Sequence, residues 1–492
     1  MGLLSACAAA QPVVPDVTPA AAPSVGPPRQ TERLSYRLTF ATEGGRPTRL
    51  QARVCFPDHV PTTLIPGLPR AGRYLVGAFR THDGGALPQD SRTGAVTLRG
   101  VSTGQCVRLE VNLADLAAQE LGGATLLAEG SLTTTAGLWL WRPQMLAPGI
   151  KATARVVLPS GVAFSAPWPQ EANGEYNLDV TAFQLPSRVV VGRFTALTVP
   201  AAPGQPRFDV AVLHGSRRAT DAGVIRWIEA AARAQLHVFR GFAVEKVQVV
   251  VAPVPGFGVD PVSFGMAFRG GGAGVVLLLG SRADDAVLPG EWVAVHELFH
   301  VGMPRLLGRA AWLFEGVTQY YTEVLRGRAG FLSPREAWQR LVSGFGRGRL
   351  GVSTQTLAEA SATMHQTGAY QRVYWGGAAI ALQWDVALRR ASEGALTLDD
   401  AMEALRECCA RDRRAWTAEE LIVWLERWWG GAPLFRPIAQ PQLQSAAFPE
   451  LSSLWEKLGI RVQGGRVSWR AGGEEWVRDA IMAPQRAPRA AP

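Results

Sequence analysis

Apolar and polar residues alternate along short segments in the first part of the chain. Residues 34–40, which read LSYRLTF, carry an apolar side chain at every second position, the period of a half-buried β-strand. Turn sequences such as Asp83-Gly84-Gly85 separate this run from later ones. The pattern predicts an all-β domain of the sandwich type over residues 32–205. Similar short runs occupy residues 51–56, 95–98, 106–111 and 152–158.

Beyond about Thr220 the apolar pattern lengthens. Residues 222–241 follow the period of an amphipathic helix. Two apolar runs of strand length follow at residues 246–254 and 274–280. This mixture predicts an α+β domain over residues 206–330.

Helical signals dominate after Pro289. Segments beginning at Ser333 and at Thr417 carry a glutamate three positions later, which is the signature of a capping box at a helix start. We expect a mainly helical domain over residues 331–430. Residues 431–482 are predicted to form a small mixed segment.

The two ends of the chain have a different composition. Cys7 follows Leu4-Ser5-Ala6, which resembles the lipobox of bacterial lipoproteins, but only six residues precede it and none is basic. We therefore interpret residues 1–31 as a truncated signal and a disordered linker, and residues 483–492 as a disordered tail. The resemblance predicts a periplasmic envelope protein, lipid-anchored at Cys7. The alternative is a disordered tail on a cytoplasmic protein.

Composition excludes several classes of protein. The 492 residues are 47% hydrophobic, which is enough for a large core, and no apolar run reaches the roughly 18 residues of a membrane-spanning helix. The net charge is +9, but the chain has only three lysines and its arginines are scattered. Nucleic-acid binders usually gather their basic residues on one face, so we expect no nucleic-acid partner.

Five cysteines are too few for a disulfide scaffold in a chain of this length. Cys55 and Cys106 both fall in the predicted β domain, where they form either a disulfide or two buried thiols. Cys408 and Cys409 lie in a predicted helix and are expected to serve in packing.

The strongest chemical signal is the sequence His296-Glu297-Leu298-Phe299-His300. Apolar residues around it favour a helix, in which positions i and i+4 share one face. His296 and His300 would then present two imidazoles to one zinc ion, and Glu297 would hold a water beside it. Only seven histidines occur in the whole chain, so this spacing is improbable by chance.

Catalytic zinc requires a third protein ligand and one open position. The second predicted helix, beginning near Trp312, carries Glu315 among apolar neighbours. Gly302, Pro304 and Gly308 break the chain between the two helices and permit a tight reversal. Antiparallel packing would bring Glu315 to the two histidines, which completes a His₂Glu set for one zinc ion.

These motifs together resemble the gluzincin zinc peptidases, and within them the glycyl aminopeptidase family. The likeness to aminopeptidase N and leukotriene hydrolase is more distant. The segments that carry it are H-E-x-x-H, then W-L-x-E-G with a following Tyr pair, then residues 356–361 (TLAEAS) and 373–378 (VYWGGA). The resemblance covers roughly residues 220–430. It implies a thermolysin-like α+β catalytic domain with a helical half behind it.

The resemblance also implies roles for individual residues. His296, His300 and Glu315 match the zinc ligands, and Glu297 matches the general base. Tyr374 matches the tyrosine whose hydroxyl stabilises the oxyanion. These roles agree with general chemistry, in which zinc polarises the scissile carbonyl and a carboxylate moves the proton.

The chain departs from the family at several points. An edge strand in these aminopeptidases carries a glutamate that binds the free amino group of the substrate. The matching residues here are Gly265, Met266 and Ala267, so the glutamate position holds alanine. These three residues are predicted to bind substrate, but strict aminopeptidase action is in doubt. His365 lies near Tyr374 in sequence, although a position away from the site is the simpler reading. No PDZ domain is recognisable after Gly430.

The sequence therefore predicts a zinc metallopeptidase acting on peptides or proteins, with exopeptidase and endopeptidase action both open. Two alternatives remain. One is an inactive envelope protein that keeps the fold for binding or scaffolding. The other is a zinc hydrolase of a non-peptide substrate.

Overall fold

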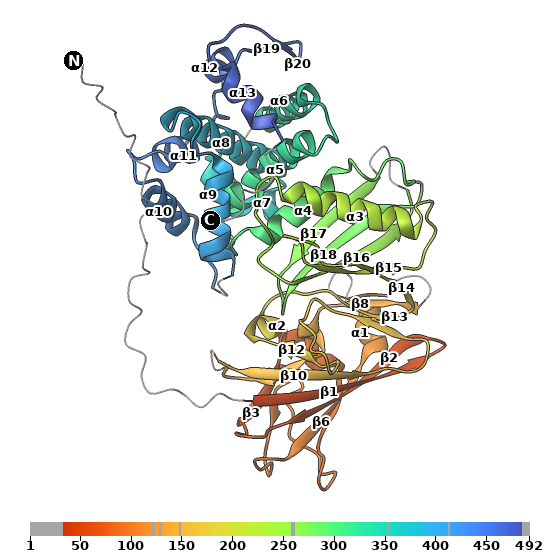
Figure 1. Cartoon of the computed structure of the whole chain (residues 1–492). Helices are drawn as coiled ribbons and strands as arrows, with labels where there is room; N and C mark the ends of the chain where they lie inside the picture. Colours follow the sequence, from red (N-terminus) through yellow and green to blue (C-terminus); the bar gives the residue numbers. More distant parts are fainter. Residues whose placement is uncertain are drawn as a thin grey trace, which may run out of the picture.

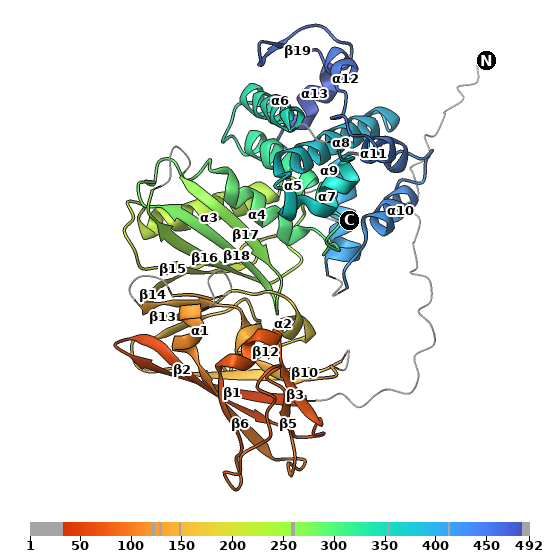
Figure 2. The same cartoon turned by 180° about the vertical axis from the view of Figure 1, so that it is seen from behind.

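The computed structural model describes residues 33–119, 124–126, 130–146, 149–256, 261–351, 354–411 and 414–484. A strand-rich region, a five-stranded sheet with helices, and a helical region follow one another along the molecule (Figures 1 and 2). This is the order of regions that the sequence predicts. None of the helices in the described ranges has the length and apolarity needed to cross a bilayer. Cys7 and the expected linker lie outside these ranges.

The strand-rich region is built on a six-stranded sheet. Its first strand confirms the alternating pattern, because Leu34, Tyr36, Leu38 and Phe40 are buried and the residues between them are not. Most neighbouring strands are antiparallel, but β1 and β10 are parallel. The strand order is β12 (Tyr176–Leu178), β10 (Lys151–Val157), β1 (Arg33–Glu43), β2 (Arg46–Cys55), β6 (Cys106–Asn112) and β4 (Leu75–Arg80).

Smaller sheets and short helices complete this region. A second sheet has the order β11 (Ala163–Ser165), β13 (Val189–Gly192), β8 (Leu132–Thr134) and β7 (Ala124–Leu126). A third has the order β5 (Val96–Thr97), β3 (Thr63–Pro66) and β9 (Trp141–Pro143). The short helices are η1 (Pro69–Tyr74), α1 (Leu113–Gln119), η3 (Ala136–Leu138) and α2 (Val180–Gln184).

Two cysteine pairs are bonded. Cys55 and Cys106 face each other across β2 and β6, and a disulfide joins them. The structure thus selects the disulfide from the two possibilities that the sequence left open. Cys408 and Cys409 are also joined to each other, where packing alone was expected; only Cys409 is buried.

The central sheet has the order β14 (Phe194–Val199), β15 (Arg207–Leu213), β16 (Lys246–Val254), β18 (Ala273–Gly280) and β17 (Val262–Phe268). Strands β15, β16 and β18 are parallel, and β17 forms an antiparallel edge. Because β14 pairs with β15, this sheet begins at Phe194 and not after residue 205, where the sequence placed the boundary.

The two faces of the central sheet have different partners. On β16, Val247, Val249 and Val251 pack in the core with α3 (Asp221–Gln235) and α4 (Trp292–Gly302). Val250 and Ala252, on the opposite face, pack against Val190 of the strand-rich region. Because both faces of β16 are buried, residues on each face are apolar and the strand reads as a continuous apolar run. The third helix ends at Gln235, before the predicted residue 241, because residues 236–239 continue in tight turns.

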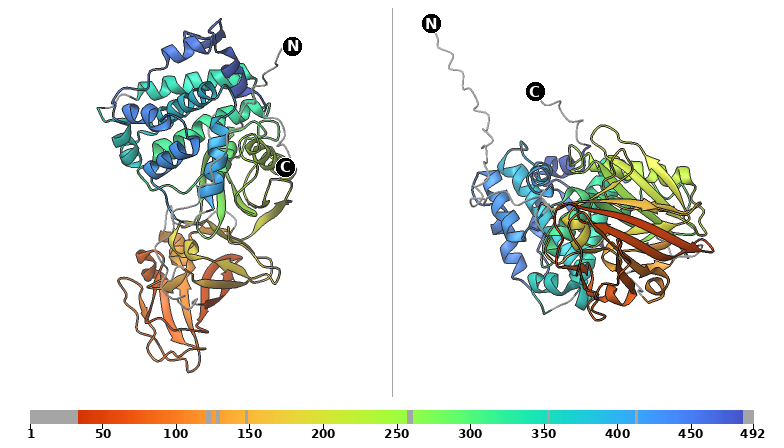
Figure 3. Two further views of the ribbon diagram at one scale, coloured as in Figure 1. Left: turned by 60° about the vertical axis from the view of Figure 1, so that its left-hand side comes forward. Right: turned by 90° about the horizontal axis from the view of Figure 1, so that it is seen from below.

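The helical region lies at the opposite end of the molecule from the strand-rich region (Figure 3, left). Capping boxes are present at Ser333 and Thr417 as predicted, and also at Thr356 and Thr397. The helices are α5 (Ala311–Arg328), α6 (Pro334–Leu350), α7 (Leu357–Thr367), α8 (Tyr370–Ala391), α9 (Leu398–Leu405) with a π-helical turn (Arg406–Ala410), α10 (Ala418–Trp429) and α11 (Phe435–Leu443). The final segment comprises α12 (Ser452–Lys457), the hairpin β19 (Ile460–Gln463) and β20 (Arg466–Trp469), and α13 (Glu475–Met482).

Helices α5 and α8 pack unusually closely where the motif glycines lie. A Cβ atom at Gly316 would come within 2.4 Å of the Cα of Gly377, and one at Gly377 would meet the carbonyl oxygen of Trp312. Glycine at both positions therefore permits the contact that holds the two helices together. Because α5 carries Glu315 and α8 carries Tyr374, this contact also sets the distance between two candidate site residues.

Candidate active site

Helix α4 presents the two histidines of the H-E-x-x-H motif. Its first residues donate backbone hydrogen bonds to the buried carboxylate of Glu291, which caps the helix. His296 and His300 lie one turn apart, each only 3% exposed, with ring centroids separated by 4.9 Å. The predicted shared helix face is thus present in the structure.

Glu315 reaches both rings from α5. Its Oε2 atom lies 3.3 Å from Nε2 of His296 and 3.3 Å from Nε2 of His300. Ligand atoms of the three residues all lie within 4.8 Å of one another. Two imidazole nitrogens and one carboxylate are a standard donor set for catalytic zinc, and their spacing leaves room for an ion among them. The residues therefore fit the metal that the sequence predicted.

Two threonines on α5 orient the histidine rings. Nδ1 of His296 lies 3.0 Å from the hydroxyl of Thr322, and Nδ1 of His300 lies 3.2 Å from that of Thr318. Each hydroxyl donates its own proton to a backbone carbonyl one turn earlier, so it accepts from the ring. With Nδ1 donating to threonine, Nε2 is the nitrogen that faces Glu315, and it would bind a metal there once it has lost its own proton.

Sequence reasoning missed Thr318 and Thr322, although a signal exists. Thr318 and Thr322 follow Glu315 by three and seven residues, so all three lie on the same face of the helix. Threonine at these positions has a structural alternative, bonding to the preceding turn, so the pattern alone does not reveal the contact with histidine.

The side chain of Glu297 extends from α4 toward the edge strand β17. A Cβ atom at Gly265 would meet Cγ of Glu297 at 2.6 Å, so glycine is needed for the strand to approach the helix here. Burial raises the pKa of the Glu297 carboxyl, while the charges of His300 and His296 and a backbone hydrogen bond from Ala267 oppose the rise. Gly265 and Ala267, predicted to bind substrate, thus also hold the candidate base.

Tyr374 covers the candidate metal site from α8. Its ring is stacked on His296, with centroids 6.0 Å apart and planes 3° from parallel, and its hydroxyl is hydrogen-bonded to Glu315. Burial and the nearby charge of Glu315 raise the pKa of the phenol. For Glu315, burial favours the neutral form, but the charge of His300 and the hydrogen bonds from both rings outweigh it, so its pKa is lowered.

These residues open into a cavity of about 890 Å³. A second, more apolar cavity of about 410 Å³ adjoins it, because Met266, Ala267, Phe314, Glu315 and His365 line both. The candidate zinc site thus lies at the junction of two hollows. His365, for which the sequence favoured a position away from the site, belongs to this shared wall and lies 3.3 Å from the hydroxyl of Tyr370.

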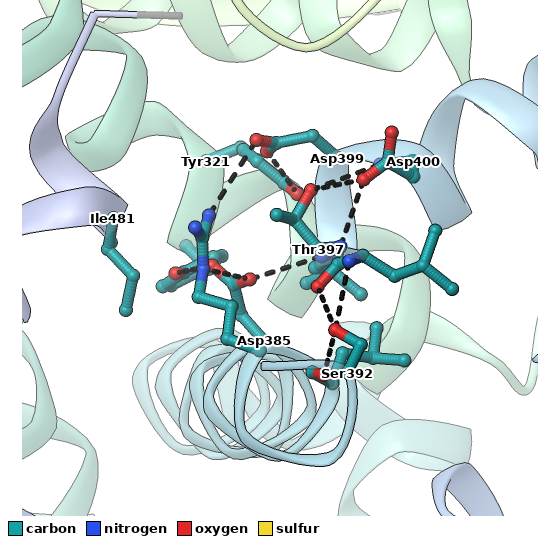
Figure 4. A network of polar contacts seen from close by, with 12 residues as sticks. Tyr321, Asp385, Ser392, Thr397, Asp399, Asp400 and Ile481 are labelled. Atoms are coloured by element: carbon teal, nitrogen blue, oxygen red, sulfur yellow. Dashed lines mark hydrogen bonds and ion pairs between the residues drawn. The ribbon is translucent and has the colours of Figure 1, made fainter. Parts of the chain in front are cut away.

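An ionic network fixes the far side of α5. The hydroxyl of Tyr320 donates to Asp385 at 2.7 Å, and that of Tyr321 donates to Asp399 at 2.9 Å; Tyr321, Asp385 and Asp399 are labelled in Figure 4. Arg328, whose side chain is fully buried, pairs with Asp399 at 3.0 Å. The Tyr pair of the sequence motif therefore does not reach the candidate zinc site. It ties α5 to α8 and α9, which holds Glu315 in place from behind.

Comparison with known proteins identifies related molecules. Residues 305–381 match the model of the family described as M61 glycyl aminopeptidase. No match was found among curated protein sequences. Among solved structures, the chain is similar to an aminopeptidase N family protein from Idiomarina loihiensis, with a TM-score of 0.66 and 17% identity over 87% of this chain and 79% of that one.

The M1 zinc metallopeptidase from Deinococcus radiodurans is also similar, with a TM-score of 0.53 and 17% identity over 86% of this chain and 94% of that one. A mutant of that peptidase, bound to a Tyr-Ser-Ala substrate, aligns with a TM-score of 0.53 and 16% identity over 86% of this chain and 95% of that one. The matched segment carries Glu315 and Tyr374, and the chain shares the fold of M1 zinc metallopeptidases, so it is similar to the M61 glycyl aminopeptidases in sequence and to the M1 aminopeptidases in structure.

Proposed function

We propose that the chain hydrolyses peptide bonds with one zinc ion held by His296, His300 and Glu315, and with Glu297 as general base. The observation that carries the proposal is the group of three ligands within 4.8 Å of one another, next to a buried carboxylate at the wall of a large cavity. We also propose that the central sheet with α4 and α5 forms a thermolysin-like catalytic unit. The envelope location and the anchor at Cys7 stay predictions.

Zinc bound here would supply a Lewis acid that lowers the pKa of water and polarises a carbonyl. Glu297 is placed to accept the proton of the attacking water and to deliver it to the leaving amine. Its packing against β17 holds the carboxylate in one position, so little reorganisation is needed. The hydroxyl of Tyr374, which donates to Glu315, would donate to the carbonyl oxygen as that atom becomes negative.

The edge strand provides a surface for the substrate backbone. On its outer side β17 has no partner strand among the described residues, so an extended peptide can add to it by backbone pairing. Glycine at 265 and alanine at 267 leave no carboxylate on this strand to hold a free amino group. The adjoining apolar cavity continues past Ala267 toward Phe268 and Leu306. We therefore propose that substrate extends on both sides of the zinc and that the chain acts as an endopeptidase.

A peptide assay tests this proposal. Zinc-loaded protein is expected to cleave fluorogenic peptides of about eight residues with free and with acetylated N-termini at similar kcat/KM, because no anchor charge distinguishes them. An aminopeptidase would lose nearly all activity on the acetylated set. Cleavage of only the free peptides, one residue at a time, would contradict endopeptidase action. Zinc binding without turnover of either set would contradict the proposed activity and favour a binding protein.

A further inference from the structure

One side of the large cavity carries positive charge that the proposed chemistry does not use. Arg340 and Arg347 lie two turns apart on α6, are exposed to solvent, and line the cavity together with Arg326 of α5. Arg326 is neutralised by Glu323, whose carboxylate it meets at 2.8 Å. Among the described residues, Arg340 and Arg347 form no ion pair.

The two free guanidinium groups differ in how they are held. Arg347 lies 5.1 Å over the ring of Trp375, and its Nε donates to the side-chain oxygen of Gln371 at 3.3 Å. These contacts fix the side chain yet leave its terminal nitrogens free to donate. The side chain of Arg340 makes no hydrogen bond within the described ranges. A planar guanidinium that is oriented but unpaired is well suited to bind a carboxylate.

The position of this charge relative to the zinc site follows from α5. Both arginines line the same cavity as Glu323, and their charges lower the pKa of its carboxyl against the raising effect of burial. Glu323 lies eight residues after Glu315 on one helix, which is about 12 Å along the axis at about 1.5 Å per residue. An extended peptide covers that distance in roughly three or four residues at about 3.3 Å each.

We propose that Arg340 and Arg347 form a subsite that binds a carboxylate of the substrate, roughly three or four residues from the scissile bond. Arg340 and Arg347 line the large cavity and not the apolar one. The subsite therefore contacts substrate residues on only one side of the scissile bond. This inference rests on the proposed function. The carboxylate comes either from an acidic side chain or from the C-terminus of the substrate.

Peptide binding tests the subsite without requiring turnover. The full chain with Glu297→Gln, in the presence and absence of zinc, is titrated with labelled alanine-based octapeptides that carry one glutamate at each position in turn, each paired with its glutamine twin. At one or two neighbouring positions the glutamate peptide is expected to bind at least about tenfold more tightly than its glutamine twin, because hydrogen bonds to a charged group typically change affinity by at least about that factor. C-terminal acid and amide forms of each peptide distinguish the two sources of the carboxylate.

Three variants assign the preference to residues. The double change Arg340→Gln with Arg347→Gln is expected to reduce the preference for the glutamate peptide to less than about threefold. The double change Arg340→Lys with Arg347→Lys is expected to retain part of that preference. Arg349→Gln is the matched control, because Arg349 is on the same helix but packs over Phe448 outside the cavity. Equal binding of the glutamate and glutamine twins together with equal binding of the C-terminal acid and amide forms would overturn the subsite, as would a preference that survives the double glutamine change. If the subsite preference is present but the chain with native Glu297 and zinc cleaves no peptide, the proposed activity alone is contradicted.

Discussion

Substitution of Glu297 by Gln is expected to lower kcat for peptide hydrolysis by roughly 10²- to 10⁴-fold, the usual contribution of a positioned general base. The amide has nearly the shape of the carboxylate, so it keeps the contact with β17 at Gly265. It cannot accept a proton from water at neutral pH. Because Glu297 is not one of the three grouped ligands, the variant is expected to bind as much zinc as the parent chain.

The measurement is kcat on the best peptide of the acetylated set, with zinc content determined on the same sample. Glu456→Gln is a suitable control, because its side chain is 71% exposed and lies outside both cavities. Unchanged turnover in Glu297→Gln would contradict the base role. Loss of zinc together with turnover would show that Glu297 acts on the metal and not on the proton.

The ionic network behind α5 leads to the largest expected effect on stability. Asp399→Ala removes the partner of Arg328 and the acceptor of the Tyr321 hydroxyl, and leaves a guanidinium buried without its charge partner. Breaking one side of a buried ion pair typically costs about 3–5 kcal/mol. For a domain of this size that corresponds to a decrease of roughly 6–20 °C in Tm.

Thermal unfolding followed by circular dichroism measures this decrease. Asp58→Ala provides the matched control, because Asp58 pairs with Arg33 at the surface, where the two side chains are 32% and 64% exposed and an ion pair contributes little to stability. A Tm for Asp399→Ala equal to that of the control would mean that the network does not support α5.

Local patterns predicted much of this molecule. Strand β16 has the predicted bounds, and the helix at the H-E-x-x-H motif forms as expected because its apolar neighbours pack against the sheet. The capping boxes at Ser333 and Thr417 form because they depend on residues only three positions apart. The placement of Glu315 also followed from sequence, since a short reversal between two helices leaves few alternatives.

Contacts between distant segments could not be predicted in this way. The pairing of β14 with β15 depends on register and not on composition, so the first boundary was placed too late. The Tyr pair looked like part of the site motif, yet its partners Asp385 and Asp399 lie 65 and 78 residues away. The roles of Thr318 and Thr322, and the position of His365 in the cavity wall, likewise depend on how three helices meet.

The central claim is that one zinc ion lies among His296, His300 and Glu315. Anomalous X-ray diffraction at the zinc edge, from crystals of the full chain grown with zinc, tests it most directly. We expect one strong peak at about 2.0–2.2 Å from Nε2 of both histidines and from a carboxylate oxygen of Glu315. No peak among these three residues, or a peak held by other side chains, would contradict the account.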